Sequence, residues 1–171
     1  MPKFVRLNVE DHKLLDDNSV IEDVTTVGLP TIEHPTTSVK AAGMVMDVDI
    51  PNMYHYNAME LEVSHNNGTN CKLLARPGNH TLEFRVARDI YDAVAGETDL
   101  ELVKVIVRGA HKSTEKGDIE TGNPYGSTEK YSILRYEEEI NGETTTLIDA
   151  TGGKIKINGV DYSSKLNSLL N

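Results

Sequence analysis

Alternation of apolar and polar residues with a period of two runs through most of the chain, and it restricts the fold more than any other feature. Such alternation is typical of strands that bury one face and expose the other. It occurs at residues 5–10, 44–50, 59–63, 82–86 and 103–108. The sequence therefore predicts a mainly β protein.

Turn residues separate the strand-like segments. Asn141-Gly142 divides two of them and is the strongest short hairpin signal in the chain. A turn around Gly96 should join two long strands, while Gly152-Gly153 and Asn158-Gly159 enclose a short one. We expect two packed antiparallel sheets arranged as a sandwich or barrel.

Evidence for helices is sparse. Residues 69–76 can form two turns that end at Pro77-Gly78, and residues 163–171 can form a short amphipathic helix. Residues 88–95 fit either state, and we favour a strand. One short α-helix is expected beside the sheets.

A length of 171 residues suits a single domain, and no internal repeat marks a second one.

Residues 28–44 are too long for a turn, and their two prolines argue against a helix. We therefore expect a long extended hairpin arm at 28–44, a surface loop at 110–128 and a C-terminal tail at 162–171.

Charge and composition exclude several classes of protein. The chain carries 17 Lys and Arg against 27 Asp and Glu, a net charge of −10, whereas proteins that grip phosphates need the opposite balance. No apolar run approaches membrane-spanning length, and we expect no export signal at the start. Cys71 is the only cysteine, so no internal disulfide can form.

The sequence offers no pattern for catalysis. Its six histidines show no zinc-binding spacing, and neither a G-x-S-x-G motif nor a P-loop is present. Cys71, beside two leucines, suits a small buried hydrophobic residue better than a nucleophile. Asp47-x-Asp49 is a weak metal motif. We expect no catalytic residue, no cofactor and no metal.

Four acidic residues form a pattern of a different kind. Asp47, Asp49, Glu60 and Glu62 fall on the polar faces of two consecutive strands, which we expect to pair antiparallel. Like charges on paired strands are destabilising, and no lysine interrupts either segment. Such a face is either simply solvated or kept acidic for a function.

Several short motifs occur in a distinctive order. They are Leu29-Pro30, Ala41-Ala42-Gly43-Met44, Ala58-Met59-Glu60, Arg108-Gly109, a glycine-rich loop with Lys112 and Lys116, Asn141-Gly142, Ile148-Asp149 and Ile157-Asn158-Gly159-Val160-Asp161. In this order, over residues 24–170, the chain resembles the major tail tube protein family of contractile-tailed bacteriophages and the tubes of R-type bacteriocins.

The resemblance implies a structural subunit without catalysis. Family members form hexameric rings that stack into a conduit, and their partners are further copies, tail sheath, baseplate and tail terminator proteins. Viral DNA passes through without specific binding. The implied location is the virion tail, assembled in the cytoplasm of the bacterial host.

The resemblance also gives the candidate residues roles. Asp47, Asp49, Glu60 and Glu62 would line the bore and repel the phosphate backbone. The arm would lie on a neighbouring subunit or ring. Its candidate contact residues are Leu29, Pro30, Ile32, His34, Pro35, Val39, Lys40, Gly43 and Met44.

Other functions stay open at this point. One is the tube of a bacteriocin or of a type VI-like injection system, and another is a monomeric β-sandwich that binds a ligand such as a carbohydrate. The chain has seven Tyr but no Trp for a sugar-binding face. A hydrolase is the weakest alternative. Residues 10–23 are longer and more acidic than the family pattern, and Leu169-Leu170 replaces its Leu-Gly.

Overall fold

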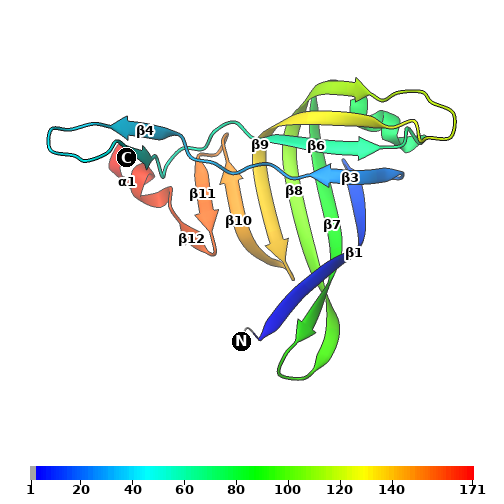
Figure 1. The fold of residues 1–171 in the computed structure, drawn as a ribbon, viewed down its shortest axis with the longest axis horizontal. Helices are drawn as coiled ribbons and strands as arrows, with labels where there is room; N and C mark the ends of the chain where they lie inside the picture. Colours follow the sequence, from blue (N-terminus) through cyan, green and yellow to red (C-terminus); the bar gives the residue numbers. More distant parts are fainter. Residues whose placement is uncertain (1–2) are drawn as a thin grey trace.

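Long antiparallel strands form the frame of the molecule in the computed structural model, which describes residues 3–171 (Figure 1). The main sheet has the order β12-β11-β10-β9-β8-β7-β1-β2, and β6 pairs with both β3 and β9. β4 and β5 form a separate pair. The predicted fold, mainly β with a short helix, is confirmed. The strands are β1 (Phe4–Asp16), β2 (Ser19–Ile21), β3 (Val24–Gly28), β4 (Thr36–Val39), β5 (Val48–Pro51), β6 (Glu60–His65), β7 (Asn79–Asp92), β8 (Glu97–Lys116), β9 (Ser127–Ile140), β10 (Glu143–Asp149), β11 (Lys154–Ile157) and β12 (Val160–Asp161).

The main sheet folds over on itself where β8 and β9 bend. Arg108 lies opposite Arg135 but Gly109 opposite Ile133, so that Leu134 is an extra residue on β9. Such bulges bend a strand and increase its twist. β6 pairs with the first part of β9, and β10 pairs with the second part. β9 therefore belongs to both layers of the sandwich.

The core lies between these layers. Leu61 and Val63 of β6 belong to one cluster with Phe84 of β7 and Val107 of β8, all of them fully buried or nearly so. The alternation at residues 59–63, 82–86 and 103–108 thus marks buried faces correctly, whereas the apolar residues of the segments at 5–10 and 44–50 are largely exposed. The other members of the cluster are Leu14, Ile21, Cys71, Leu74, Leu82, Val105, Tyr131, Ile133 and Tyr136.

Both predicted helical segments are helical. Residues 69–76 contain the 3₁₀ helix η1 (Asn70–Ala75), which places Cys71 and Leu74 in the core. The C-terminal segment forms α1 (Ser164–Leu170), none of whose residues is buried. Among residues 3–171, no helix is both long and apolar enough to cross a membrane.

Two predicted boundaries are wrong. Alternation suggested a strand from residue 44, but β5 begins at Val48, and residues 44–47 belong to the loop that joins it to β4. The surface loop expected at 110–128 covers only residues 117–126. β8 continues to Lys116 because residues 113–116 pair with residues 127–130 of β9.

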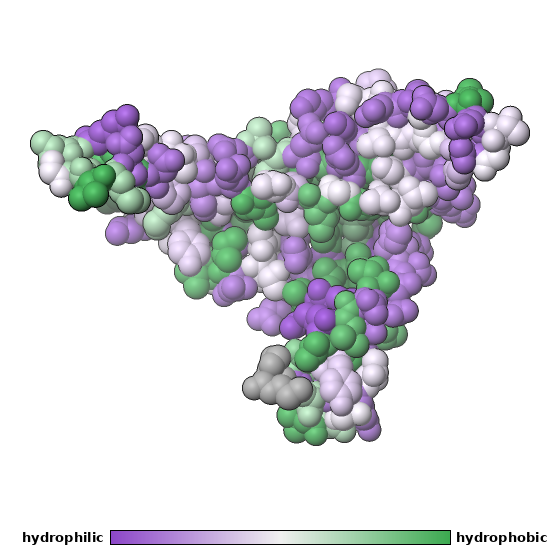
Figure 2. All heavy atoms as spheres, viewed as in Figure 1, coloured by the Kyte–Doolittle hydropathy of each residue, from purple (hydrophilic) through white to green (hydrophobic). Residues whose placement is uncertain are grey.

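Three projections give the molecule a triangular outline (Figures 1 and 2). The β4–β5 arm extends to one side, the loop at 117–126 extends to the other, and the β7–β8 hairpin points away from both. Apolar side chains gather at the end of the arm, over the lower part of the long strands and on the β7–β8 hairpin.

Candidate assembly surfaces

The arm is a long hairpin whose two limbs continue β3 and β6. Its outer part is the β4–β5 pair. Nearer the body, the amide of Asn52 donates to the carbonyl oxygen of Pro35 at 2.8 Å, and the amide of Asn57 donates to that of Glu33 at 2.7 Å. The arm is therefore an ordered two-stranded element along much of its length.

Large apolar side chains on the arm lie in solvent instead of packing on the body. Val45 is fully exposed, and Met46 is 71% exposed. Single exposed apolar residues are ordinary, but a group of them on one element marks a contact surface. The exposed large apolar residues of the arm are Leu29, Ile32, Met44, Val45, Met46, Val48, Ile50 and Met53.

The nine residues that the sequence assigned to arm contacts all lie on this element. Lys40 and Gly43 are exposed, as are the three apolar residues Leu29, Ile32 and Met44, whereas Pro30, His34, Pro35 and Val39 are partly buried within the arm. The His34 ring stacks on Tyr56 with centroids 4.3 Å apart, which ties one limb to the other. Their contact with another subunit stays a prediction.

The four acidic residues do not share one face. Asp47 and Asp49 lie at the outer end of the arm, where Lys40 pairs with Asp47 at 3.1 Å. Glu60 and Glu62 lie in β6, which pairs with β3 and β9. The expected pairing of the two acidic strands is therefore wrong. β5 and β6 are successive parts of one hairpin limb, and they cannot pair with each other.

Lysines from adjacent strands offset the charge on β6. Lys112 of β8 lies 2.6 Å from Glu60, and Lys130 of β9 lies 3.2 Å from Glu62. The hydrogen bond from Lys112 holds the pKa of Glu60 below its ordinary value. This face is a mixed-charge surface, because strand pairing brings in lysines that lie far away in the sequence.

The main sheet has open edges. In the described part of the chain, β3 pairs only with β6, and residues 4–13 of β1 pair only with β7. Unpaired strand edges carry free backbone donors and acceptors, which another strand can satisfy. The edges of β3 and β1 are therefore available for pairing between subunits.

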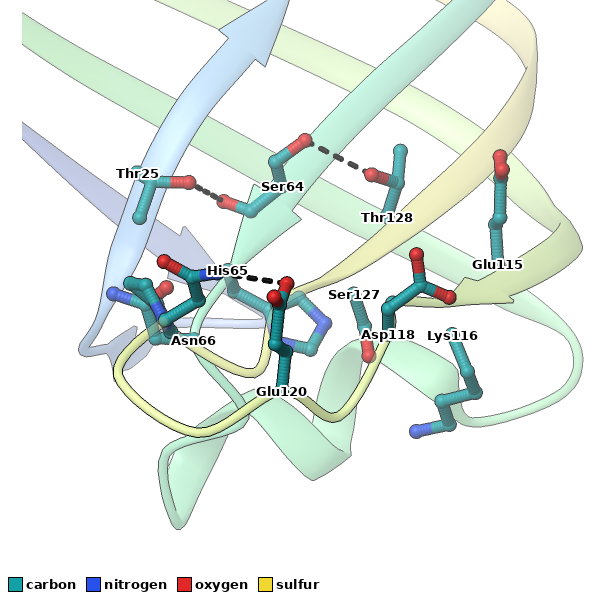
Figure 3. A pocket seen from close by; sticks show the side chains of 14 residues that line it. Thr25, Ser64, His65, Asn66, Glu115, Lys116, Asp118, Glu120, Ser127 and Thr128 are labelled. Atoms are coloured by element: carbon teal, nitrogen blue, oxygen red, sulfur yellow. Dashed lines mark hydrogen bonds between the residues drawn. The ribbon is translucent and has the colours of Figure 1, made fainter.

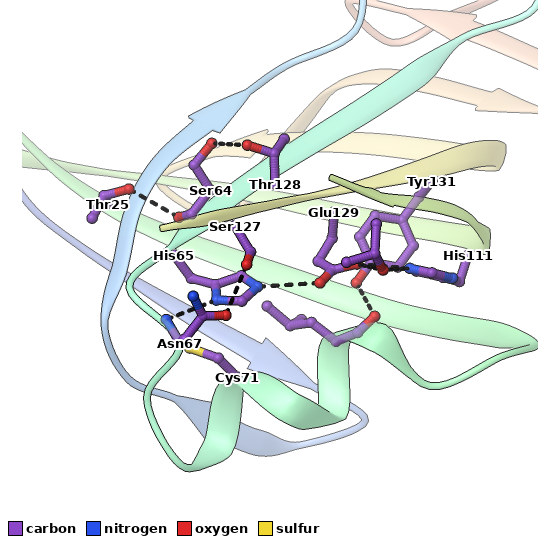
Figure 4. Close-up of polar contacts among 12 residues, drawn as sticks. Thr25, Ser64, His65, Asn67, Cys71, His111, Ser127, Thr128, Glu129 and Tyr131 are labelled. Carbon is purple, nitrogen blue, oxygen red and sulfur yellow. Dashed lines mark hydrogen bonds and ion pairs between the residues drawn. The ribbon is translucent and has the colours of Figure 1, made fainter. Parts of the chain in front are cut away.

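A buried carboxylate joins the strands that support these edges (Figure 4). Glu129 of β9 is fully buried, and its oxygens lie 2.7 Å from His111 Nε2, 2.5 Å from Thr114 Oγ1 and 3.3 Å from His65 Nε2. Burial alone would raise the pKa of Glu129, but the three hydrogen bonds outweigh burial and lower it. The ionised carboxylate thus connects β6, β8 and β9.

A second buried pair lies beside the first. His80 Nδ1 is 2.8 Å from a carboxylate oxygen of Asp16, and its Nε2 is 2.7 Å from the carbonyl oxygen of Arg76. The Tyr131 hydroxyl donates to the carbonyl oxygen of Leu74 at 2.6 Å. Burial is the main reason that the pKa of Asp16 is raised. These bonds attach η1 and its flanking residues to the sheet, which is a structural role.

The surface also has a polar hollow of about 400 Å³ beneath the loop at 117–126 (Figure 3). Glu115, Asp118 and Glu120 lie on its walls, and Ser64 is hydrogen-bonded to Thr128 at 3.0 Å. Within residues 3–171, no cluster of His, Cys, Asp or Glu has the arrangement of a metal site. The hollow brings together no nucleophile with an adjacent base.

Comparison with known families decides between a tube subunit and a binding module. The family model of the phage tail tube protein FII matches residues 12–170. The chain belongs to this family. It is a structural phage tail tube protein and not an enzyme. No curated protein matches its sequence.

Solved structures share the fold of this tail tube protein. Two are parts of the PVC extracellular contractile injection system, the sheath/tube terminator and the sheath-tube complex, both in the extended state. Each has a TM-score of 0.54 at 10% identity and covers 78% of this chain, with 96% and 90% of its own chain matched. A chain of the anti-feeding prophage baseplate also matches, with a TM-score of 0.45 at 10% identity over 75% of this chain and 90% of that one.

Sequence reasoning missed the lysine partners of β6 and the buried histidines of this tail tube protein. Most of these contacts join residues that lie far apart in the sequence, such as Glu60 with Lys112 and His65 with Glu129, and all of them depend on how the strands are arranged in the sheet. Glu129 shares its parity with Tyr131 and Ile133, a pattern that could have marked it as a buried carboxylate. Its histidine partners had no local signal.

Proposed function

We propose that copies of this tail tube protein form hexameric rings, which stack into the tube of a contractile phage tail. The observation that carries the proposal is the arm. It is an ordered hairpin that leaves the body and keeps Val45 and Met46 in solvent. A head-to-tail contact between identical subunits closes into a ring when its rotation permits, and stacking then extends the ring.

The open edges of β3 and β1 support the same assembly. Proteins in water usually cover or blunt the edge strands of their sheets, because an unpaired edge can pair with another chain. A closed ring of subunits removes the problem by pairing these edges with each other. The single tail tube domain would then contact its neighbours through the arm, and the loop at 117–126 and the tail at 162–171 would lie towards other tail components. The sheath, baseplate and terminator proteins are the proposed partners, in the virion tail, after assembly in the host cytoplasm.

We propose that Glu60 and Glu62 face the bore, through which viral DNA passes to the host. Because Lys112 and Lys130 offset the charges of Glu60 and Glu62, this face neither repels nor binds the phosphate backbone strongly. Such a surface suits DNA that slides past it. Asp47 and Asp49 lie far along the arm, and we assign them to contacts between subunits in place of the bore.

A tube of an injection particle that carries no DNA is the second candidate. It is favoured by the similarity of fold to the PVC injection system and by the mixed charge near Glu60. The two candidates differ in whether DNA passes through the assembled tube in the particle.

Negative-stain microscopy of the purified protein over a range of concentrations tests the assembly. The proposal expects rings or tubes of uniform bore, and sedimentation should reveal species of at least six chain masses. A protein that stays monomeric at every concentration and salt level contradicts it.

A further inference from the structure

An apolar groove of about 420 Å³ opens between the two layers of the sandwich, which we call the inter-layer groove. Its apolar lining includes Val27 and Leu29 from β3 and the residue after it, and Phe84, Val86 and Val103 from β7 and β8. In Figure 2, apolar side chains are visible over the long strands below β3. The groove is continuous with the core, because Phe84 belongs to both.

The groove exists because β3 is much shorter than the sheet beneath it. β3 has five residues, whereas β7 has 14 and β8 has 20. The inner face of the longer strands continues past the end of β3 without a covering strand. The groove lies between β3 and β1, and both of these strands have open edges. A hairpin placed there would cover apolar surface and lie next to unpaired backbone groups.

The chain's own arm cannot fill this groove. The arm extends away from the body on the side opposite the loop at 117–126 (Figure 1). The groove is lined by residues of β3 and of the long strands and by none beyond Leu29 in the arm. Each copy therefore presents an apolar hairpin and an apolar groove that only another copy can bring together. This is the relation between two unlike surfaces that generates head-to-tail assembly.

The end of the arm matches the groove in chemistry. Met44, Val45 and Met46 form its exposed apolar tip, and methionine side chains adapt to irregular gaps. The groove lining also holds Arg88, which is paired with the buried Glu101 at 2.6 Å, and Glu138. Because these charges include both signs and Arg88 already has a partner, the match between tip and groove is one of apolar surface.

We propose that residues Met44–Met46 of one subunit insert into the inter-layer groove of a neighbouring subunit. The proposal rests on the proposed self-assembly, and it names the surface that receives the arm. Insertion buries the apolar tip and covers the open end of the core in a single contact.

Disulfide cross-linking between two differently tagged chains tests this assignment. Both chains carry Cys71→Ser. One carries Val45→Cys, and the other carries Val27→Cys, Val86→Cys or Val103→Cys in turn. As a control, a chain with Val94→Cys at the exposed end of the β7–β8 hairpin takes the place of the groove-cysteine chain. Because a disulfide requires Cα atoms within about 7 Å, bonds report close contact only.

We expect at least one groove cysteine to give a mixed dimer with Val45→Cys under mild oxidation, and Val94→Cys to give at least tenfold less. Rings or tubes that form without any groove cross-link, or with preferential cross-linking to Val94→Cys, overturn the inference while self-assembly stands. Wild-type protein that never assembles overturns both.

A charge in the groove provides a second test. Val86→Asp should reduce the assembled fraction at least tenfold, whereas Val94→Asp should leave it within twofold. Circular dichroism identifies folded subunits in both cases. If folded Val86→Asp protein assembles like the wild type, the groove does not receive the arm.

Discussion

At the scale of single residues, the buried Glu129 contributes most clearly to the rigidity of the subunit. It is fully buried, and His65, His111 and Thr114 surround its carboxylate. A buried ion is tolerated when hydrogen bonds replace its hydration. A rigid sheet beneath the open edges is what repeated assembly requires.

Glu129→Gln should destabilise the fold. The amide keeps the shape of the side chain but loses the charge, and hydrogen bonds to a charged group contribute about 1.5–3 kcal/mol. We expect a loss of about 2 kcal/mol in the free energy of unfolding, measured with urea. Glu97→Gln, at an exposed position on the β7–β8 hairpin, should change that energy by less than about 0.5 kcal/mol. Equal stability of the two variants would contradict the role of the network.

The same carboxylate makes stability depend on pH. Its pKa is lower in the folded protein than its ordinary value of 4.5, so the folded state favours the ionised form. Its stabilisation is complete above that ordinary value and is lost as the pH falls through the lowered pKa. Burial raises the pKa of Asp16 and gives a slope of the opposite sign. Comparison of wild type with Glu129→Gln isolates the first effect.

The wild type should therefore lose more stability than Glu129→Gln between about pH 6 and about pH 3. Urea unfolding at several pH values measures the difference between the two proteins. A constant difference across this range would show that Glu129 does not titrate with the fold.

At the scale of elements, the bend in β8 and β9 creates the two layers. Gly109 lies at this bend, and a Cβ atom there would come within 2.7 Å of the carbonyl oxygen of Ser132. That oxygen belongs to the backbone of β9 and cannot move aside without disturbing the strand.

Gly109→Ala should consequently destabilise the subunit by about 1–3 kcal/mol, the usual effect of overpacking. Thermal unfolding followed by circular dichroism measures the change. Gly126→Ala is the matched control, because its Cβ would meet only the carbonyl oxygen of His65, at 3.4 Å. A melting temperature of Gly109→Ala equal to that of the control would contradict this account of the bend.

The arm can be removed at a natural closure point. Asn52 donates to Pro35 at 2.8 Å, so deleting residues 36–51 joins two positions that already lie side by side. Because the deleted pair contacts little of the body, we expect a folded subunit with a melting temperature within a few degrees of the wild type. It should not polymerise, as measured by light scattering. Normal tubes from this variant would refute the bridging role of the arm.

Local patterns were enough to predict most elements but not their partners. Asn141-Gly142 and Gly96 mark real hairpins because turn chemistry is local. The pairing of β6 with β3 follows instead from the closure of a long arm, and the pairing of β6 with β9 joins segments separated by β7 and β8, so no local signal specifies either. For that reason the sequence placed Glu60 and Glu62 correctly on a polar face but next to the wrong strand.

At the scale of the whole molecule, the proposed bore depends on the charge of the β6 face. The double substitution Glu60→Lys, Glu62→Lys would place two more lysines beside Lys112 and Lys130 and make this face basic. Exposed ion pairs contribute about 0–1 kcal/mol each, so folding and assembly should persist. The basic face should bind the phosphate backbone and slow DNA ejection.

Ejection from phage particles that carry the variant tube measures this effect. The matched control is Glu97→Lys with Asp99→Lys, which reverses two exposed charges on the β7–β8 hairpin. Slower ejection from the β6 variant alone is expected. Equal rates from both variants would place Glu60 and Glu62 outside the bore.

The central claim is that the free edges and the arm of one subunit are completed by other copies of the same chain. Cryo-electron microscopy of the assembled protein tests it most directly. The account predicts six-fold rings in which β3 or β1 pairs with a strand of the next subunit and each arm lies on a neighbour. An assembly whose arms project into solvent, with those edges unpaired, would contradict it.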